Sequence, residues 1–135
     1  MNIMDELANS GNGIYKKTRF TMIENNFILN PNYTVYEKCV YIALSTYAFN
    51  KGSCYPSQAL LSEQLNISRP MVTKALKGLE EKGGLLMVKR QMESNRRISN
   101  LIFLAEINTY TGEFIKESLD EFRIYKNRVL IVKGR

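Results

Sequence analysis

Residues 57–82 constrain the fold of this chain most, because they combine two helix starts with two apolar faces. Ser57 is a favourable N-cap residue, and leucines spaced along one helical face follow it. After a short interruption, Ser68 caps a second helix with Pro70 in its first turn, where a missing amide hydrogen costs nothing. The pattern therefore predicts two helices joined by a tight turn.

The second predicted helix has an apolar side and a polar side. Residues at helical spacing predict its buried stripe: Val72, Ala75, Leu76 and Leu79. The polar side suits the major groove of DNA, since arginine pairs with guanine, threonine offers a hydroxyl and lysine neutralises phosphate. The candidate DNA contacts on this helix are Ser68, Arg69, Pro70, Thr73, Lys74 and Lys77. A solvated face of an ordinary amphipathic helix is the alternative interpretation.

Two apolar segments separated by a basic stretch follow this helix. Residues 85–88 and 98–107 are predicted strands, and residues 89–97 a polar loop. Residues 66–100 carry eight lysines and arginines against three glutamates, which is +5 of the chain's net +6. This order is the outline of a winged helix, whose wing follows a minor groove that attracts arginine. The predicted wing contacts are Lys89, Arg90, Asn95, Arg96 and Arg97.

The segment upstream completes a three-helix scaffold. Residues 34–49 predict a helix that begins with a capping box, formed by Thr34 and by Glu37 three residues later. Its apolar face is predicted to be Val40, Leu44 and Tyr47. Residues 53–55 predict a short strand, and residues 20–29 an extended piece with one helical turn. At the start of the next helix, the candidate phosphate contacts are Tyr55, Ser57 and Gln58.

The chain of 135 residues divides into three predicted parts. Residues 1–17 are expected to form a flexible tail, residues 18–107 a winged helix-turn-helix DNA-binding domain, and residues 108–135 an extension. The predicted fold class is therefore α+β: a three-helix core, a β-hairpin wing and an additional C-terminal segment containing a strand.

The extension is predicted to contain a turn at residues 108–113, a short helix at 114–122 and a strand at 124–132. Because the last apolar run is continuous rather than alternating, we expect it to be buried on both faces. Two partners could bury it: the wing sheet of the same chain, which we favour, or a second protomer.

Several function classes find no support in the composition. The chain has no histidine and only two cysteines, Cys39 and Cys54, so no zinc site, other metal site or cofactor is expected. Neither a phosphate-binding loop nor a histidine for acid–base work is present, and we therefore expect no enzyme activity. Without a long apolar run or a signal-peptide core, we expect a cytoplasmic protein with no membrane partner.

Five segments carry a resemblance to known domains: Asn30-Pro31-Asn32-Tyr33-Thr34, Cys54-Tyr55-Pro56-Ser57, Ser68-Arg69-Pro70, Lys74-Ala75-Leu76 and Leu79-Glu80-Glu81-Lys82-Gly83. They resemble winged helix-turn-helix domains of Firmicutes plasmid and phage proteins, such as the N-terminal domains of DnaD-like replication proteins and small regulators. The resemblance covers residues 18–107 and implies that the polar side of the second helix faces the major groove. One departure is Gly78 inside that helix, which costs about 1 kcal/mol relative to alanine.

We therefore expect a sequence-specific double-stranded DNA-binding protein. It would act in transcription regulation, or as an accessory factor in plasmid or phage replication, partition or transfer, with a replication or transfer protein as a further partner. A homodimer is expected because one module reaches few bases, and paired half-sites about one helical turn apart follow. The alternative is a winged-helix interaction or oligomerisation module of a replisome-type assembly that binds DNA only weakly.

Overall fold

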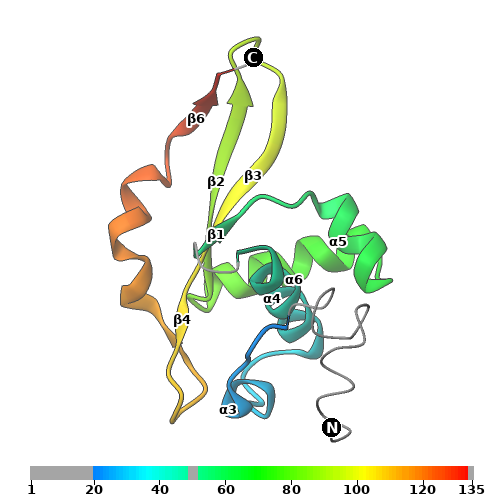
Figure 1. Cartoon of the computed structure of the whole chain (residues 1–135), viewed down its shortest axis with the longest axis vertical. Helices are drawn as coiled ribbons and strands as arrows, with labels where there is room; N and C mark the ends of the chain where they lie inside the picture. The colour runs from blue at the N-terminus through cyan, green and yellow to red at the C-terminus, as the bar shows by residue number, and fades with distance from the viewer. Residues whose placement is uncertain (1–19, 49–51, 134–135) are drawn as a thin grey trace, which may run out of the picture.

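The computed structural model describes residues 20–48 and 52–133 as one succession of helices followed by strands (Figure 1). The predicted tail, residues 1–17, lies outside the described residues. The elements are α3 (Asn25–Ile28), α4 (Val35–Ala48), β1 (Ser53–Cys54), α5 (Gln58–Leu65), α6 (Arg69–Glu81), β2 (Leu85–Met92), β3 (Arg97–Leu104), β4 (Glu106–Ile107), β5 (Phe114–Ile115), the 3₁₀ helix η1 (Lys116–Tyr125) and β6 (Val129–Val132).

Helix α4 begins with the predicted capping box. The Thr34 amide donates to Glu37 Oε1 at 2.9 Å, and the Glu37 amide donates to Thr34 Oγ1 at 3.1 Å. The predicted apolar face is only partly correct, because Tyr47 is 40% exposed. Tyr41 is buried instead, and its hydroxyl donates to the Ala105 carbonyl at 2.5 Å. A hydroxyl that finds a backbone acceptor allows a tyrosine ring to be buried, and periodicity does not indicate which tyrosine has one.

Helices α5 and α6 start at the predicted residues. The Ser57 hydroxyl accepts the Leu60 amide at 3.0 Å, and the Ser68 hydroxyl accepts the Met71 amide at 3.3 Å. Between the helices, Asn66 adopts the left-handed conformation with φ of 55°, which ends α5 and turns the chain. The predicted stripe of α6 is buried in full: Val72, Ala75, Leu76 and Leu79. The predicted helix-turn-helix is therefore confirmed.

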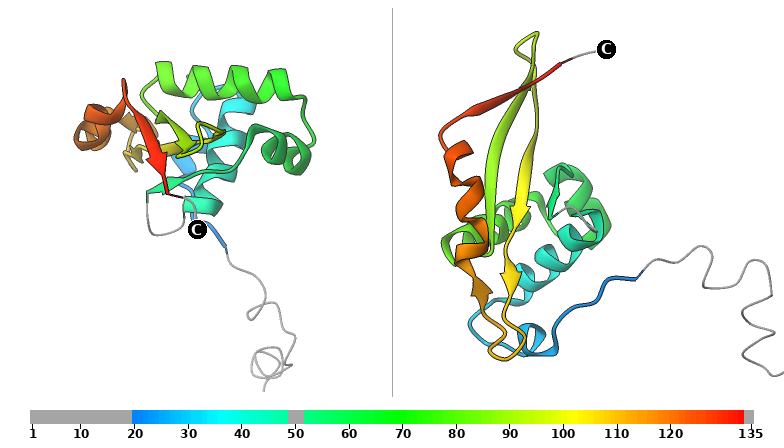
Figure 2. Two further views of the ribbon diagram at one scale, coloured as in Figure 1. Left: turned by 90° about the horizontal axis from the view of Figure 1, so that it is seen from above. Right: turned by 60° about the vertical axis from the view of Figure 1, so that its left-hand side comes forward.

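The main sheet contains four strands in the order β1–β3–β2–β6. Strands β1, β3 and β2 pair antiparallel, whereas β6 lies parallel to β2. The β2–β3 hairpin extends away from the helices as the wing, and β6 runs along it (Figures 1 and 2). The sheet therefore connects the helical core at one end to a projecting wing at the other.

The prediction of a loop over residues 89–97 is wrong in its extent. Strand β2 continues to Met92, so only residues 93–96 form the turn. The Met92 amide donates to the Arg96 carbonyl at 2.8 Å, and Asn95 takes the left-handed φ of 67° that closes the turn. The polar segment is a strand because it has pairing partners on both sides: β3 lies opposite Arg90 and Gln91, and β6 pairs along residues 89–92.

The predicted strand over residues 98–107 is interrupted at Ala105. Strand β3 ends at Leu104, although the Ala105 amide still donates to the carbonyl of Gly84, the residue opposite it in the β2–β3 register, at 2.9 Å. The chain then continues as β4, which pairs antiparallel with β5 in a second sheet of two strands. The apolar run thus supplies two sheets, and its composition alone does not mark the break.

The predicted helix over residues 114–122 is also partly wrong. Its first two residues form β5, and the 3₁₀ helix η1 follows. Leu119 of η1 is buried, and the Phe122 ring stacks on the Phe103 ring with a centroid distance of 4.1 Å. These contacts place η1 against the wing strands.

The prediction of a strand over residues 124–132 is correct for β6 only. The strand pairs within the chain, as we favoured, but it is not buried on both faces: Val129 is 45% exposed and Ile131 is 54% exposed. Strand β6 is the last strand of the sheet. Within the described part of the chain, the side chains of Val129 and Ile131 are left exposed.

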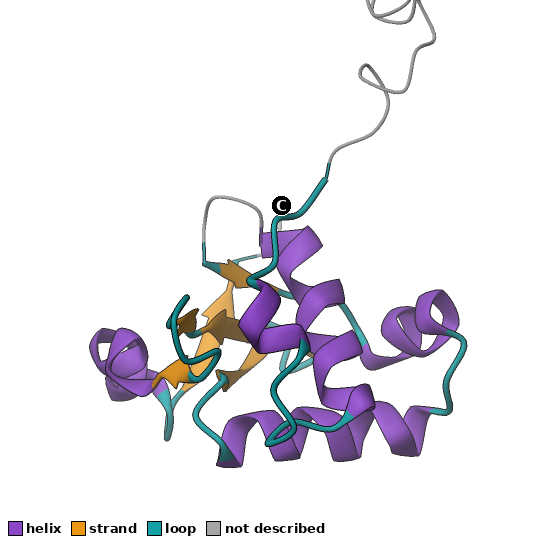
Figure 3. Ribbon diagram, turned by 90° about the horizontal axis from the view of Figure 1, so that it is seen from below, coloured by secondary structure: helices purple, strands orange, loops and turns teal. Residues whose placement is uncertain are grey.

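These elements form an α+β winged helix-turn-helix with an additional C-terminal strand, as predicted. Seen from below, the helices lie around one end of the sheet (Figure 3). Within residues 20–48 and 52–133, no helix is long and apolar enough to cross a membrane.

Candidate nucleic-acid interface

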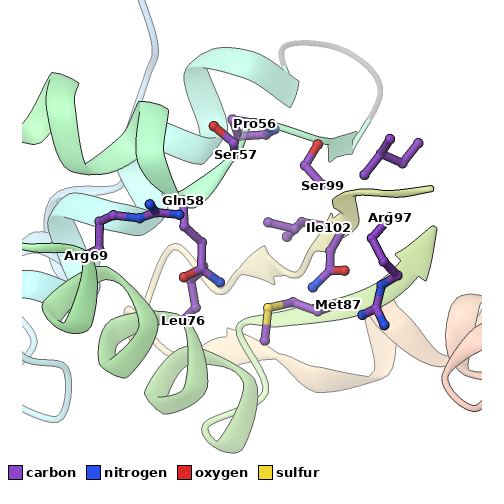
Figure 4. A pocket seen from close by; sticks show the side chains of 11 residues that line it. Pro56, Ser57, Gln58, Arg69, Leu76, Met87, Arg97, Ser99 and Ile102 are labelled. Atoms are coloured by element: carbon purple, nitrogen blue, oxygen red, sulfur yellow. The ribbon is translucent and has the colours of Figure 1, made fainter. Parts of the chain in front are cut away.

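A groove separates the start of α6 from the wing. It has a volume of about 440 Å³, and its walls include Ser57 and Gln58 from α5 and its cap, Arg69 from α6, and Arg97 from β3. Leu76, Met87 and Ile102 supply apolar surface inside it. In Figure 4 the Arg69 side chain points toward Gln58, and Arg97 stands on the opposite wall. Two cationic side chains from separate elements therefore border one open groove.

The predicted contacts on α6 occupy two different sides of the helix. Arg69 borders the groove beside the wing. Pro70, Lys74 and Lys77 lie around a second hollow of about 650 Å³ on the side toward α4. Ser68 is exposed at the cap of the helix, where its hydroxyl already accepts an amide hydrogen. The outer surface of α6 is thus basic on both sides of its exposed ridge.

Thr73 is half-buried, and its hydroxyl lies against the side chain of Gln58 in α5. Thr73 Oγ1 lies 2.6 Å from Gln58 Oε1 and 3.1 Å from the Arg69 carbonyl oxygen. Gln58, predicted as a phosphate contact, is therefore bonded to Thr73, predicted as a contact of the recognition helix. Sequence spacing could not reveal this bond, because it joins two helices.

The predicted wing contacts divide into two groups. Asn95 and Arg96 lie exposed in the turn, Arg97 starts β3 and Lys89 is exposed on β2. Arg90 also lies on β2 but differs from Lys89, since its side chain is half-buried. The exposed basic residues of the wing are therefore Lys89, Arg96 and Arg97.

Arg90 and Tyr55 contact each other directly, and both also bond to Ser99 of β3. The Arg90 Nε–H donates to the Ser99 carbonyl at 2.9 Å, and its guanidinium lies 4.7 Å from the centre of the Tyr55 ring. The Ser99 hydroxyl in turn donates to the Tyr55 carbonyl at 2.7 Å. This cation–π and hydrogen-bonded link fixes the wing to the strand that precedes α5. Both residues were predicted as DNA contacts, but here their polar groups connect parts of the protein.

The buried carboxylate of Glu37 lies under α6 and was not predicted from the sequence as part of this surface. Glu37 is 5% exposed, and Lys82 Nζ lies 2.6 Å from Glu37 Oε1. A Cβ atom at position 78 would lie 1.9 Å from Glu37 Oε2, so only glycine leaves room for the carboxylate. Gly78, a glycine inside a predicted helix, was the sequence signal that could have indicated a close neighbour there.

The charges near the interface differ in their partners. The salt bridges among the described residues are Lys82–Glu37, Arg123–Asp120 and Lys126–Glu80. None of them involves Arg69, Lys74, Lys77, Arg96 or Arg97. Arg69, Lys74, Lys77, Arg96 and Arg97 are therefore available to an anionic partner, whereas Arg123 and Lys126 are paired with carboxylates.

The described residues offer little to a metal ion. Within residues 20–48 and 52–133, no group of three or more histidine, cysteine, aspartate or glutamate side chains could hold one. Both cysteines are free thiols; Cys39 is exposed, and burial raises the pKa of Cys54 to about 12. The buried thiol is therefore protonated at neutral pH.

Comparisons with known proteins agree with this architecture. Residues 34–85, which span α4 to the start of β2, match a family described as a helix-turn-helix domain. A chain from a solved structure, described as the structure of a Rep–DNA complex, is similar with 23% sequence identity and a TM-score of 0.50. The similarity covers 90% of this chain and 94% of that chain, and it shows a shared fold. No curated protein sequence is significantly similar to this chain.

Proposed function

We propose that this protein binds double-stranded DNA, with α6 in the major groove and the wing along the adjacent minor groove. The observation that carries the proposal is the groove between α6 and the wing, bordered by Arg69 and Arg97, neither of which forms a salt bridge within the described residues. When a helix and a wing occupy neighbouring DNA grooves, the phosphate backbone between those grooves passes over the surface that separates them. Arginines at that place neutralise phosphates.

The fold similarity supports the same proposal. The helix-turn-helix match covers α6, which would dock in the major groove, but not the wing, and the similar solved structure is described as a Rep–DNA complex. Among the roles that we expect, this neighbour favours an accessory function in plasmid or phage replication over transcription regulation. We further propose a homodimer that reads paired half-sites in the cytoplasm, a non-catalytic DNA-binding protein without a cofactor.

Fluorescence anisotropy with labelled duplexes tests this function directly. We expect affinity to fall steeply with salt, and one native sequence to be preferred by about a thousandfold or more over random DNA. Arg69→Glu should weaken binding most, because it reverses a charge on the groove wall. Charge reversal at Glu117, an exposed residue of η1, is the control and should not weaken binding. Parent-like affinity of Arg69→Glu would remove α6 from the interface.

A second candidate function has one observation in its favour. Strand β6 leaves Val129 and Ile131 exposed at an open sheet edge, and such edges are templates for pairing with another chain. This feature favours a protein-interaction module with weak DNA binding. Weak, sequence-blind binding in the anisotropy experiment, together with a stable complex between chains in light scattering, would support this alternative over the first.

A further inference from the structure

Only one end of the Gln58 side-chain amide, its oxygen, has a hydrogen-bond partner among the described residues. Its Oε1 atom lies 2.6 Å from Thr73 Oγ1, so the carbonyl end of the amide accepts the threonine hydroxyl. Gln58 Nε2 donates to no atom of the described residues. Because the amide is planar, fixing its oxygen against α6 directs its two N–H groups away from that helix. The result is a hydrogen-bond donor of defined direction.

The surroundings of this donor favour an anionic acceptor. Gln58, Arg69 and Arg97 line the same groove, and neither arginine has a carboxylate partner within the described residues. Phosphate oxygens only accept hydrogen bonds, whereas base edges present both donors and acceptors. A fixed donor between two arginines thus matches the backbone of a DNA strand better than it matches a base edge.

Gln58 is one of the phosphate contacts expected from the sequence, and we propose how it acts: Thr73 is the positioning residue that orients the amide, so that Gln58 donates a hydrogen bond to a phosphate oxygen of the DNA strand in this groove. The inference rests on the proposed function, and it reassigns Thr73 from a predicted contact of the recognition helix to a support for Gln58. The Thr73 hydroxyl is suited to this role because its single hydrogen has the close acceptor Gln58 Oε1 at 2.6 Å, whereas the Arg69 carbonyl oxygen is farther away at 3.1 Å.

A double-mutant cycle on DNA affinity tests the pair. Thr73→Val keeps the shape of the side chain but removes the hydroxyl, and Gln58→Ala removes the donor. We expect each change to weaken binding about tenfold, the effect of one hydrogen bond to a charged group. The double variant should bind no worse than Gln58→Ala alone. Thr73→Ser, which keeps the hydroxyl, should bind within about twofold of the parent.

The controls separate this role from a structural one and from base reading. Gln64→Ala, at an exposed glutamine of the same helix, should leave affinity unchanged. The loss in Thr73→Val should be equal on native and unrelated duplexes, since every duplex carries phosphates. Additive losses in the double variant would overturn the positioning role, and a loss confined to one sequence would overturn the phosphate assignment.

The inference and the proposed function fail in different ways. A parent chain that binds no duplex at any salt concentration would overturn the proposed function. A parent that binds DNA while Thr73→Val and Gln58→Ala bind equally well would overturn this inference alone. Thermal unfolding of each variant shows whether a change in affinity follows from a change in stability.

Discussion

At the scale of single residues, Gly78 shows how a helix position can be chosen by a neighbour rather than by the helix. The Glu37 carboxylate occupies the space beside it while accepting the Thr34 amide and the Lys82 ammonium group. The carboxylate therefore cannot move aside without losing a helix cap and an ion pair. The unfavourable propensity of glycine in α6 is offset by these contacts.

We expect Gly78→Ala to lower the free energy of unfolding by about 1–2 kcal/mol, because the new methyl group would displace a buried carboxylate. In a Glu37→Ala background the same change should instead raise stability by up to about 1 kcal/mol, through helix propensity alone. Urea unfolding of the four chains measures both differences. The same sign in the two backgrounds would contradict this account of the glycine.

Glu113 is a second residue whose role depends on a distant segment. The Tyr33 hydroxyl donates to Glu113 Oε2 at 2.6 Å, and Asn32 Nδ2 donates to Glu113 Oε1 at 2.6 Å. The hydrogen bond from Tyr33, followed by those from Asn30 and Asn32, holds the pKa of Glu113 below its ordinary 4.5. For Tyr33, burial and the bond to Glu113 raise the pKa to about 12.

This lowered pKa predicts a pH dependence of stability. Because the carboxylate is favoured in the folded chain, Glu113 stabilises the fold above its ordinary pKa of 4.5. That contribution is lost as the pH falls from 4.5 through the folded value. We expect Glu113→Gln to flatten the acid limb of a plot of unfolding free energy against pH. Glu117→Gln, at an exposed residue of η1, should keep the limb of the parent, and equal flattening in both variants would refute the assignment.

At the scale of elements, the C-terminal segment changes the wing. Strand β6 pairs with residues 89–92 of β2, and η1 stacks Phe122 on Phe103 of β3. Between η1 and β6, Lys126 Nζ lies 2.6 Å from Glu80 Oε2, and the same oxygen accepts the Met87 amide hydrogen. The wing is therefore three strands wide along its outer part and tied to α6 at its base.

Removing the Phe122 ring should weaken the packing of η1 against β3 and, with it, the attachment of β6 to the sheet. We expect Phe122→Ala to lower the free energy of unfolding by about 2 kcal/mol, through lost apolar burial and ring stacking. Hydrogen exchange should accelerate across β6 more than across α6, since η1 delivers β6 to the sheet. Ile124→Ala, at a residue of η1 that is 62% exposed, is the matched control. Equal protection of β6 in the parent and in Phe122→Ala would show that strand pairing alone holds β6.

At the scale of the whole molecule, the net charge of +6 is distributed unevenly. Arg123 and Lys126 are paired with Asp120 and Glu80, whereas Arg96 and Arg97 form no salt bridge among the described residues. The two wing arginines therefore remain available to attract an anion, whereas the charges of Arg123 and Lys126 are already paired with carboxylates.

We therefore expect the double substitution Arg96→Gln with Arg97→Gln to reduce the salt dependence of DNA binding. The slope of log affinity against log salt should fall by up to about 2, one unit for each lost phosphate contact. Arg123→Gln removes one positive charge that is already paired and should leave the slope unchanged. A slope that falls equally in both cases would mean that net charge, rather than wing contact, sets the salt dependence.

Local patterns were enough to predict the parts of the fold that depend on neighbours in sequence. The capping residues Thr34, Ser57 and Ser68 mark the helix starts, and the buried stripe of α6 follows from helical periodicity. Backbone conformation and facing direction are decided within a few residues, so a single sequence contains them. The winged helix-turn-helix itself was predictable for this reason, as were the exposed basic positions of α6 and the wing.

The tertiary structure sets the features that join distant segments, namely strand pairing and the hydrogen-bond partners between elements. It extended β2 because β3 and β6 pair with its two sides, and it buried Tyr41 rather than Tyr47 because the Ala105 carbonyl lies within reach. It also turned Thr73 toward Gln58. Each outcome depends on which group from another element lies within hydrogen-bond distance, and spacing along the chain does not specify that. Local patterns therefore specify the helix starts and the buried stripe of α6, whereas packing selects the partner of each polar group and sets the extent of the strands.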